Sequence, residues 1–247
     1  MHESLPVFPS PLKEKKELPL LRKEGEAEEV TEHMLEGKDA VIFDFDGTLA
    51  DAEPVLLEIV NNLAPEFGYD PITPEQIPEL RKMGAKSFIL ERLGIPLWKI
   101  PGLERKARKE YANRIQNVGI FPGMKEAVER LKRAGYKTGI ISSNATPSIK
   151  EVLDRADIKV DFIASGSLFG KAKSIRNTLR EQQLAKERVI YIGDELRDVE
   201  ASRASSVDVI GVTWGLNERE VLEKAGAVTV NNPDELLDKL LTSSPSQ

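Results

Sequence analysis

One stretch decides how this chain folds: Val41-Ile42-Phe43-Asp44-Phe45-Asp46-Gly47-Thr48-Leu49. The apolar run Ala40–Phe43 predicts a short buried strand, and Gly47 marks where the chain turns away. Two carboxylates, Asp44 and Asp46, therefore follow the strand on the same side of an extended backbone. Like charges this close repel each other unless a cation or a shared proton neutralises them. The pair predicts a metal-assisted site in which one carboxylate is a nucleophile and the other a general acid or base.

The composition restricts the partners of such a site. The chain has 247 residues, 40% of them hydrophobic and 31% charged, with a formal net charge of -6. These values predict one large globular domain, or one core with an insert, and argue against nucleic acid or an anionic membrane as the main partner. No apolar run approaches the roughly 20 residues that a membrane span needs.

The absence of cysteine and the scarcity of histidine narrow the chemistry further. Without cysteine there is no disulfide and no thiolate ligand, which fits a cytoplasmic location. The two histidines, His2 and His33, both precede the main pattern. A metal ion must therefore be bound by oxygen atoms, and this favours Mg2+ as the cofactor.

Residues 1–38 differ in character from the rest of the chain. They contain four prolines and the charge-dense run Arg22–Glu29, and they lack the basic-then-apolar start of a secretory signal. We expect a flexible, solvated tail here, with a docking or regulatory arm as the alternative.

The segment 53–118 is predicted to be a helical cap inserted after the first strand. Apolar residues recur at helical spacing from Leu56 to Leu63, and Pro54 suits the first turn of that helix. Prolines from Pro65 to Pro101 then interrupt the segment, and no strand alternation is visible. Three shorter helices are expected between them, at 77–82, 85–93 and 103–116.

From residue 121 onward, strands and helices alternate. Repeated units of this kind predict an α/β fold with a Rossmann-like, doubly wound parallel sheet that is covered on both faces. The core is expected to comprise residues 39–52 and 119–242, ending in a helix capped by Asn232 and opened by Pro233. The strands are expected at 138–142, 160–164, 188–192, 207–212 and 227–230, and the helices at 124–134, 148–156, 173–183, 199–204 and 218–225.

Ligands bind at the carboxyl ends of the strands in such a sheet, so the residues that follow each strand are informative. They are Asp44 and Asp46, then Ser142-Ser143-Asn144, then Lys171, then Gly193–Asp198. Alone, each has an ordinary alternative, such as a helix cap, a surface lysine or acids at a helix start. Together they supply acids for a hard cation, a hydroxyl and amides for phosphoryl oxygens, and an ammonium group, which indicates phosphoryl transfer.

In this order and spacing the residues resemble the haloacid dehalogenase (HAD) superfamily of hydrolases. The resemblance covers residues 40 to about 240. The helical insert and the segment Gly211–Gly215 resemble the phosphoglycolate-phosphatase-like branch of that superfamily. The segments that resemble its motifs I to IV are, in order, Asp44–Thr48, Ile140–Ser142, Lys171 and Gly193–Asp198.

The resemblance implies specific tasks for the residues near the phosphoryl group. Asp44 is expected to attack phosphorus and form an aspartyl-phosphate. Asp46 is expected to protonate the leaving oxygen and then to activate the hydrolytic water. Ser142 is expected to contact the phosphoryl oxygens, and the substrate-binding groups nearby are expected at Gly47, Ser143 and Asn144.

The resemblance also implies a metal site. Mg2+ is expected to be bound by the carboxylates of Asp44 and Asp194 and by the backbone carbonyl of Asp46. Lys171 is expected to offset the charge of the nucleophile and the phosphate. Asp198 is expected to orient Lys171 or a metal-bound water from outside the metal's coordination shell.

Three assignments carry alternatives. Lys173 competes with Lys171, because the sequence lacks the proline that often follows the lysine of motif III in this family. Glu195 is an alternative metal ligand in place of a water molecule. Arg81, with Lys82 beside it, is the candidate in the cap for binding an anionic substrate.

The expected function is hydrolysis of a small phosphomonoester such as phosphoglycolate by a Mg2+-dependent phosphatase, through an aspartyl-phosphate intermediate. The expected partner is therefore a small phosphorylated metabolite. One alternative is a phosphosugar mutase of the same fold, but related mutases carry a histidine near the position of Leu56. The other is a non-catalytic binding or regulatory protein. Neither the physiological substrate nor the oligomeric state follows from the sequence.

Overall fold

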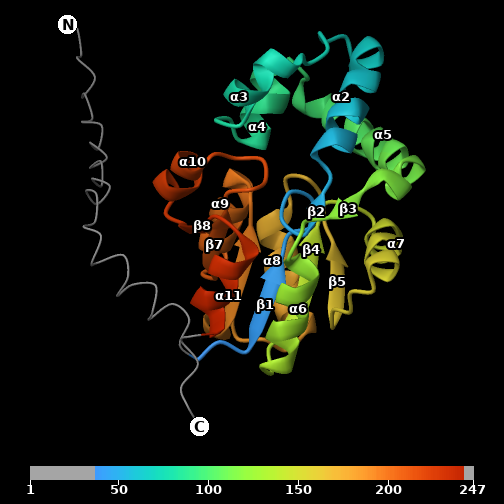
Figure 1. The fold of residues 1–247 in the computed structure, drawn as a ribbon. Helices are drawn as coiled ribbons and strands as arrows, with labels where there is room; N and C mark the ends of the chain where they lie inside the picture. Colours follow the sequence, from blue (N-terminus) through green and yellow to red (C-terminus); the bar gives the residue numbers. More distant parts are fainter. Residues whose placement is uncertain (1–36, 242–247) are drawn as a thin grey trace, which may run out of the picture.

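A six-stranded parallel sheet forms the core of the computed structural model, which describes residues 37–241. The strand order is β5-β4-β1-β6-β7-β8, and every neighbouring pair is parallel, so the expected α/β fold is confirmed (Figure 1). The predicted tail lies almost entirely outside the described residues. The strands are β1 (Ala40–Phe43), β4 (Lys137–Ser142), β5 (Phe162–Ser165), β6 (Val189–Gly193), β7 (Asp208–Val212) and β8 (Val228–Val230).

Helices cover both faces of the sheet, which explains why β1 is apolar at every position. Val41 and Phe43 point into one hydrophobic cluster, and Ala40 and Ile42 point into the other. All four are fully buried, and each large one among them contributes about 1.5–3 kcal/mol by leaving water. The first cluster includes α6 (Met124–Arg133), α7 (Thr146–Ala156) and α11 (Pro233–Leu241); the second includes α8 (Lys171–Glu181), α9 (Leu196–Ala204) and α10 (Arg219–Lys224).

Helix ends follow the local signals in the sequence. Helix α6 ends just before Gly135, whose φ of 91° is a left-handed conformation that favours glycine. At the start of α11, the side-chain oxygen of Asn232 accepts a hydrogen bond from the backbone N–H of Glu235 at 2.9 Å. Both the stop at Gly135 and the Asn232 cap are therefore confirmed.

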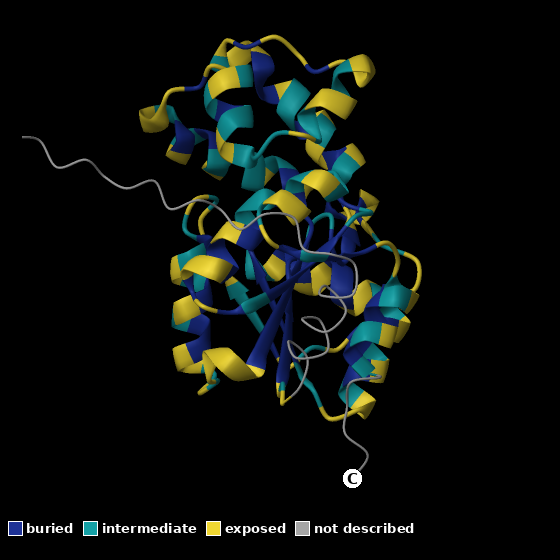
Figure 2. Ribbon diagram, turned by 90° about the vertical axis from the view of Figure 1, so that its left-hand side faces the viewer, coloured by how far each residue is buried: buried dark blue, intermediate teal, exposed yellow. Residues whose placement is uncertain are grey.

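A helical segment lies over the carboxyl ends of the strands and forms the upper part of the molecule (Figures 1 and 2). It enters and leaves through a two-stranded antiparallel ribbon of β2 (Ala50–Asp51) and β3 (Gly119–Ile120). We call the elements between these strands the cap; its domain boundaries at 53 and 118 stay a prediction. It contains α2 (Glu53–Phe67), α3 (Ile77–Leu80), α4 (Ala85–Ser87) and α5 (Ile100–Asn113), with short turns η1 (Pro74–Gln76), η2 (Phe88–Arg92), η3 (Leu97–Lys99) and η4 (Ile115–Asn117); η5 (Lys186–Arg188) precedes β6.

Some expected boundaries were wrong. Helix α2 continues through Pro65 and ends at Phe67, just before Gly68, because a proline in the last turn removes only one hydrogen bond of the helix. Strands β2 and β3 were missed, since two residues are too few to show an alternating pattern. Helix α8 begins at Lys171, two residues earlier than expected, and this places Lys171 at the helix start. Among the described helices, none is long and apolar enough to cross a membrane.

Candidate active site

The strand register brings the candidate residues to one edge of the sheet. Phe43, the last residue of β1, pairs with Ile140 of β4 on one side and with Ile192 of β6 on the other. The backbone N–H of Asp44 donates a hydrogen bond to the carbonyl of Ile192 at 2.8 Å. Residues just beyond these three strands therefore lie side by side beneath the cap, as the carboxyl ends of neighbouring parallel strands require.

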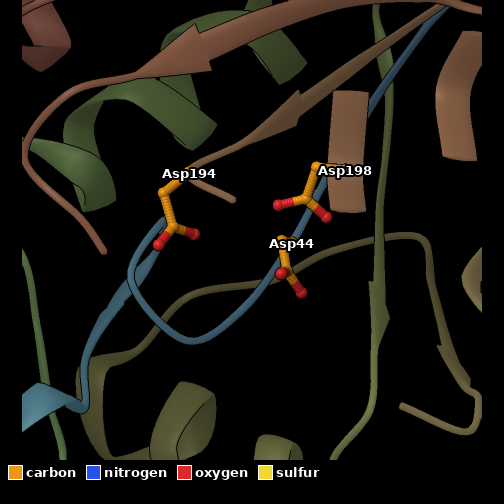
Figure 3. Close-up of side chains that lie close together, drawn as sticks. All are labelled: Asp44, Asp194 and Asp198. Carbon is orange, nitrogen blue, oxygen red and sulfur yellow. The ribbon is translucent and has the colours of Figure 1, made fainter. Parts of the chain in front are cut away.

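Three buried carboxylates form the centre of this edge (Figure 3). Asp44 follows β1, Asp194 follows β6, and Asp198 lies in the first turn of α9. One oxygen atom from each carboxylate lies within 4.8 Å of the others. Burial and the neighbouring carboxylates raise the pKa of Asp194 well above its usual value, and burial raises the pKa of Asp198 to about 7. The cluster is thus a place where positive charge is strongly favoured.

Lys171 supplies one positive charge to the cluster. Its Nζ donates to Oδ2 of Asp44 at 2.5 Å and also to Oδ1 of Asp198, and only 6% of its side chain is exposed. Burial lowers the pKa of Lys171, but the charges of Asp198 and Asp44 outweigh burial and the net shift is upward. Lys173, by contrast, is exposed on α8. The geometry therefore favours Lys171 over its competitor.

The donor set fits a divalent cation. When all three buried carboxylates are ionised, the one ammonium group of Lys171 leaves two negative charges for a bound cation to balance. The described residues contain no cysteine or histidine, and a site built of oxygen atoms is the kind that Mg2+ prefers. Both oxygens of Asp198 are engaged, one by Lys171 and the other by the backbone N–H of Glu195 at 2.9 Å. This is the arrangement expected of a residue that orients Lys171.

Asp194 is held in place by neighbours that the sequence did not identify. Thr48 donates its hydroxyl to Oδ1 at 2.7 Å, and the backbone N–H of Leu216 donates to Oδ2 at 2.8 Å. Two glycines leave room for this carboxylate: a Cβ atom on Gly47 would lie 2.0 Å from Oδ2, and one on Gly215 would lie 2.4 Å from it. The signals were present, since Thr48 belongs to the first motif and Gly215 to the segment after β7.

Asp46 is bound from two directions. Tyr111 of α5 donates its hydroxyl to Oδ1 at 2.6 Å, and the side-chain amide of Asn144 donates to Oδ2 at 2.5 Å. Loss of hydration raises the pKa of Asp46 to about 7; the hydrogen bond from Tyr111 opposes this shift, and the charge of Asp44 adds to it. Such a pKa suits a group that both gives and takes a proton near neutral pH.

The turn after β4 lies next to Asp46. Ser142 is buried, and its hydroxyl oxygen accepts a hydrogen bond from the backbone N–H of Asn144 at 3.1 Å. Ser143 and Asn144 line a cavity beneath the cap. The expected phosphate-contacting residues are thus placed together with the acids, and Asn144 has the further contact with Asp46.

The cavity between cap and core has a volume of about 280 Å³. Its walls are mostly apolar cap side chains, but a polar end faces the acids. The polar residues of the lining are Asp46, Ser143, Asn144, Asp194, Glu195 and Arg197 from the core, and Glu53, Arg81, Glu104, Arg108 and Tyr111 from the cap. A compact phosphorylated molecule fits such a space.

Two further sequence candidates have partners of their own. Arg81 lines the cavity, but its guanidinium forms an ion pair with Glu53 and donates to the carbonyl of Gly215 at 2.5 Å, so it also links cap and core. Glu195 forms an ion pair with Arg197 at 2.6 Å and does not belong to the three-carboxylate cluster. Its proposed alternative place on the metal therefore receives no support from this geometry.

Comparison with known proteins identifies the class to which this fold and site belong. The model of the haloacid dehalogenase-like hydrolase family matches residues 41–212. A phosphoglycolate phosphatase from Synechococcus elongatus is 33% identical over 189 residues, which cover 75% of this chain and 89% of that protein. A phosphorylated carbohydrates phosphatase from Thermotoga maritima is 29% identical over 219 residues, with coverages of 82% and 98%.

A solved structure agrees with this result. The crystal structure of a predicted phosphatase from Clostridium acetobutylicum matches with a TM-score of 0.72 at 25% identity, covering 83% of this chain and 99% of that one. The chain belongs to the haloacid dehalogenase-like hydrolase family. Within that family it is a phosphatase, that is, a phosphoric monoester hydrolase. The family and the enzyme class expected from the motifs are both confirmed.

Proposed function

We propose that this phosphatase is Mg2+-dependent and hydrolyses a small phosphomonoester, phosphoglycolate or a chemically similar compound, through an aspartyl-phosphate on Asp44. The observation that carries the proposal is the contact of Lys171 with Asp44 at 2.5 Å inside the buried acidic cluster, with Asp46 beside it at the cavity. The relative from Synechococcus elongatus, named a phosphoglycolate phosphatase, supports the choice of substrate class.

In the first step, a carboxylate oxygen of Asp44 forms a bond to phosphorus, and the bond between phosphorus and the leaving oxygen breaks. Protonated Asp46 gives its proton to that oxygen, so that a neutral alcohol departs. Lys171 offsets the negative charge of the nucleophile and of the phosphoryl group. Ser142, with the amides of the turn after β4, contacts the phosphoryl oxygens.

In the second step, a water molecule attacks phosphorus of the aspartyl-phosphate. Asp46, now a carboxylate, takes the proton of that water, and the acyl-phosphate bond breaks to return Asp44 and release inorganic phosphate. Asp44, Asp194 and the backbone carbonyl of Asp46 are the groups that would bind Mg2+. When bound, the ion supplies charge neutralisation at the phosphoryl oxygens.

The cap side of the cavity supports an anionic leaving group of limited size. Arg81 and Arg108, which form ion pairs with Glu53 and Glu104, bring cationic side chains to a space of about 280 Å³ that also contains Asp46. A carboxylate or a phosphorylated sugar acid can be attracted there, whereas the negative net charge of the chain gives nucleic acid no comparable site. A cytoplasmic location, expected from the cysteine-free sequence, stays a prediction.

The test measures phosphate release with Mg2+ from a panel that includes phosphoglycolate, hexose phosphates and nucleoside monophosphates. We expect one class of small phosphorylated acid or sugar to dominate kcat/KM, and Asp44→Asn to lower that value about a thousandfold or more. Asp51→Asn is the matched control, because Asp51 is an exposed aspartate seven positions further on in the sequence. Near-wild-type turnover by Asp44→Asn would overturn the mechanism, and a product that keeps its phosphate would favour the mutase alternative.

A further inference from the structure

We propose that Tyr111 of the cap is a positioning residue for Asp46, so that the orientation of the Asp46 carboxylate depends on the seating of helix α5 on the core. This inference rests on the proposed function, because it assigns Asp46 the proton transfers described above. It adds a residue from the cap to a mechanism whose other groups all come from the core.

The contact itself is direct. The hydroxyl of Tyr111 lies 2.6 Å from Oδ1 of Asp46, while Asn144 donates to Oδ2 of the same carboxylate. Tyr111 is 1% exposed and comes from a helix 65 positions further along the chain. One carboxylate is therefore held by one donor from the core and by one donor from the cap.

Two donors on different oxygens restrict the orientation of a carboxylate more than one donor does. The terminal torsion of an aspartate side chain has broad energy wells, so a single hydrogen bond leaves it considerable freedom. A proton transfer needs the donor atom within about 2.6–3.2 Å of the reacting oxygen. Without Tyr111, Asn144 would be the remaining side-chain partner of Asp46 among the hydrogen bonds of the described residues. The fraction of time that Asp46 spends in a competent orientation then falls.

Helix α5 is docked on the core by the same face that carries Tyr111. Glu104, Arg108 and Tyr111 are spaced four and three positions apart, which places them on one side of a helix. Oε1 of Glu104 accepts a hydrogen bond from the backbone N–H of Leu168 at 3.0 Å, and Arg108 donates to the carbonyl of Gly166. The position of the Tyr111 hydroxyl therefore depends on how α5 sits on this loop.

The loop that receives α5 leads directly into the catalytic centre. It connects β5 to α8 and ends at Lys171, which contacts Asp44. The position of the cap therefore affects two groups of the site: Asp46, through its hydrogen bond with Tyr111, and Lys171, through the loop that α5 contacts.

The experiment compares leaving groups in the Tyr111→Phe variant, with Mg2+ present. Departure of p-nitrophenolate needs little protonation, whereas an alkoxide such as that of glycolate needs a proton from Asp46. The proteins are each compared at their own pH optimum, because loss of the Tyr111 hydrogen bond also raises the pKa of Asp46. We expect Tyr111→Phe to lower kcat/KM for phosphoglycolate, or for the best alkyl phosphate of the panel, by about tenfold or more, with a much smaller loss for p-nitrophenyl phosphate. An equal loss on both substrates would overturn the positioning role.

Two variants serve as references. Tyr69→Phe removes a hydroxyl that donates to the carbonyl of Val60 at 2.6 Å within the cap, and we expect the ratio of the two rates to stay at the wild-type value. Asp46→Asn shows the largest change that loss of proton transfer can cause in the ratio of kcat/KM for the alkyl phosphate to that for p-nitrophenyl phosphate. Adding Tyr111→Phe to Asp46→Asn should change this ratio no further. A further change would mean that Tyr111 acts other than through Asp46. If the wild-type enzyme hydrolyses neither substrate, the proposed function fails; if it hydrolyses both but the ratio is unaffected, only the inference fails.

The dependence on docking is tested separately. Glu104→Ala removes the acceptor of the Leu168 N–H without touching Asp46. We expect this variant to shift the ratio in the same direction as Tyr111→Phe, and the double variant to lose less than the two single losses combined. Independent, additive losses would overturn the link between seating of α5 and the orientation of Asp46.

Discussion

The core side and the cap side of the active site are built differently. Asp44, Asp194 and Lys171 project from strand ends or the start of a helix in the core, and each is more than nine-tenths buried. Arg81 and Tyr111 project from cap helices and reach the core through hydrogen bonds to Gly215 and Asp46. The parallel sheet brings Asp44 and Asp194 together at neighbouring strand ends, and α8 adds Lys171 to them. The second group reaches the site only through the packing of the cap on the core.

The energies of the two sides differ accordingly. Removing one partner from the buried pairs of Lys171 leaves an uncompensated charge, which costs about 3–5 kcal/mol. The ion pair of Arg81 with Glu53 is about a third exposed on both sides, and such pairs contribute about 0–1 kcal/mol. The core site therefore resists rearrangement, while the individual contacts of the cap are weak enough to break and reform during turnover.

The largest effect is expected from removal of divalent cations, which tests the charge balance of the carboxylate cluster in the core. Removing divalent cations with EDTA should abolish phosphate release, and Mg2+ should restore it, because two negative charges of the ionised cluster would otherwise stay uncompensated. Thermal unfolding provides a second measurement: the midpoint should rise with Mg2+ concentration in the wild type, since the ion binds the folded state. That rise should be lost in Asp194→Asn. Hydrolysis that is unaffected by EDTA would contradict the metal site.

The next largest effect is expected from substitution of Lys171, compared with substitution of Lys173 on the same helix. Lys171→Ala should lower kcat/KM about a hundredfold or more and destabilise the protein by about 3–5 kcal/mol, because Asp44 and Asp198 lose their common partner. Lys173→Ala is the matched control and should change stability by less than about 0.5 kcal/mol, since Lys173 is exposed. Rates and urea unfolding of both variants check this, and the reverse order would transfer the role to Lys173.

A smaller effect is expected on the cap side. Arg81→Ala should raise KM for an anionic substrate by about tenfold with a lesser change in kcat, because Arg81 lines the cavity and links α3 to the loop after β7. Lys82→Ala should leave both constants unchanged, since Lys82 is exposed and pairs with Glu79. Equal effects of the two substitutions would remove Arg81 from the substrate site.

The smallest effect is expected outside both regions. Deleting residues 1–36 should leave kcat and KM with the best substrate essentially unchanged, because all the candidate groups lie between Asp44 and Asp198. The two constants, measured for the full-length and shortened proteins, check this. A large loss of kcat or kcat/KM would mean that residues 1–36 contribute to the active site, in addition to the core and the cap.

The core half of the site could be predicted from the sequence because ligands in such a fold bind at the carboxyl ends of the parallel strands. The ends of neighbouring parallel strands meet, so the sequence alone predicts that polar residues just beyond β1, β4 and β6 lie in one place. The same reasoning missed Tyr111, because a tyrosine on the apolar face of an amphipathic helix has the pattern of a core residue. Glu195 was an alternative metal ligand because of its position beside Asp194, and only the structure shows that its carboxylate pairs with Arg197.

The pattern of residues alone predicted the alternation of strands and helices, the family, and the candidate acids with two competing lysines. These depend on local periodicity and on short motifs, both of which are written in consecutive residues. The tertiary structure decided which lysine meets Asp44, that Thr48 and Leu216 hold Asp194, and that the cap supplies a donor to Asp46. Such contacts join atoms separated by 22 to 146 positions, and only the packing of one layer on another sets their distances.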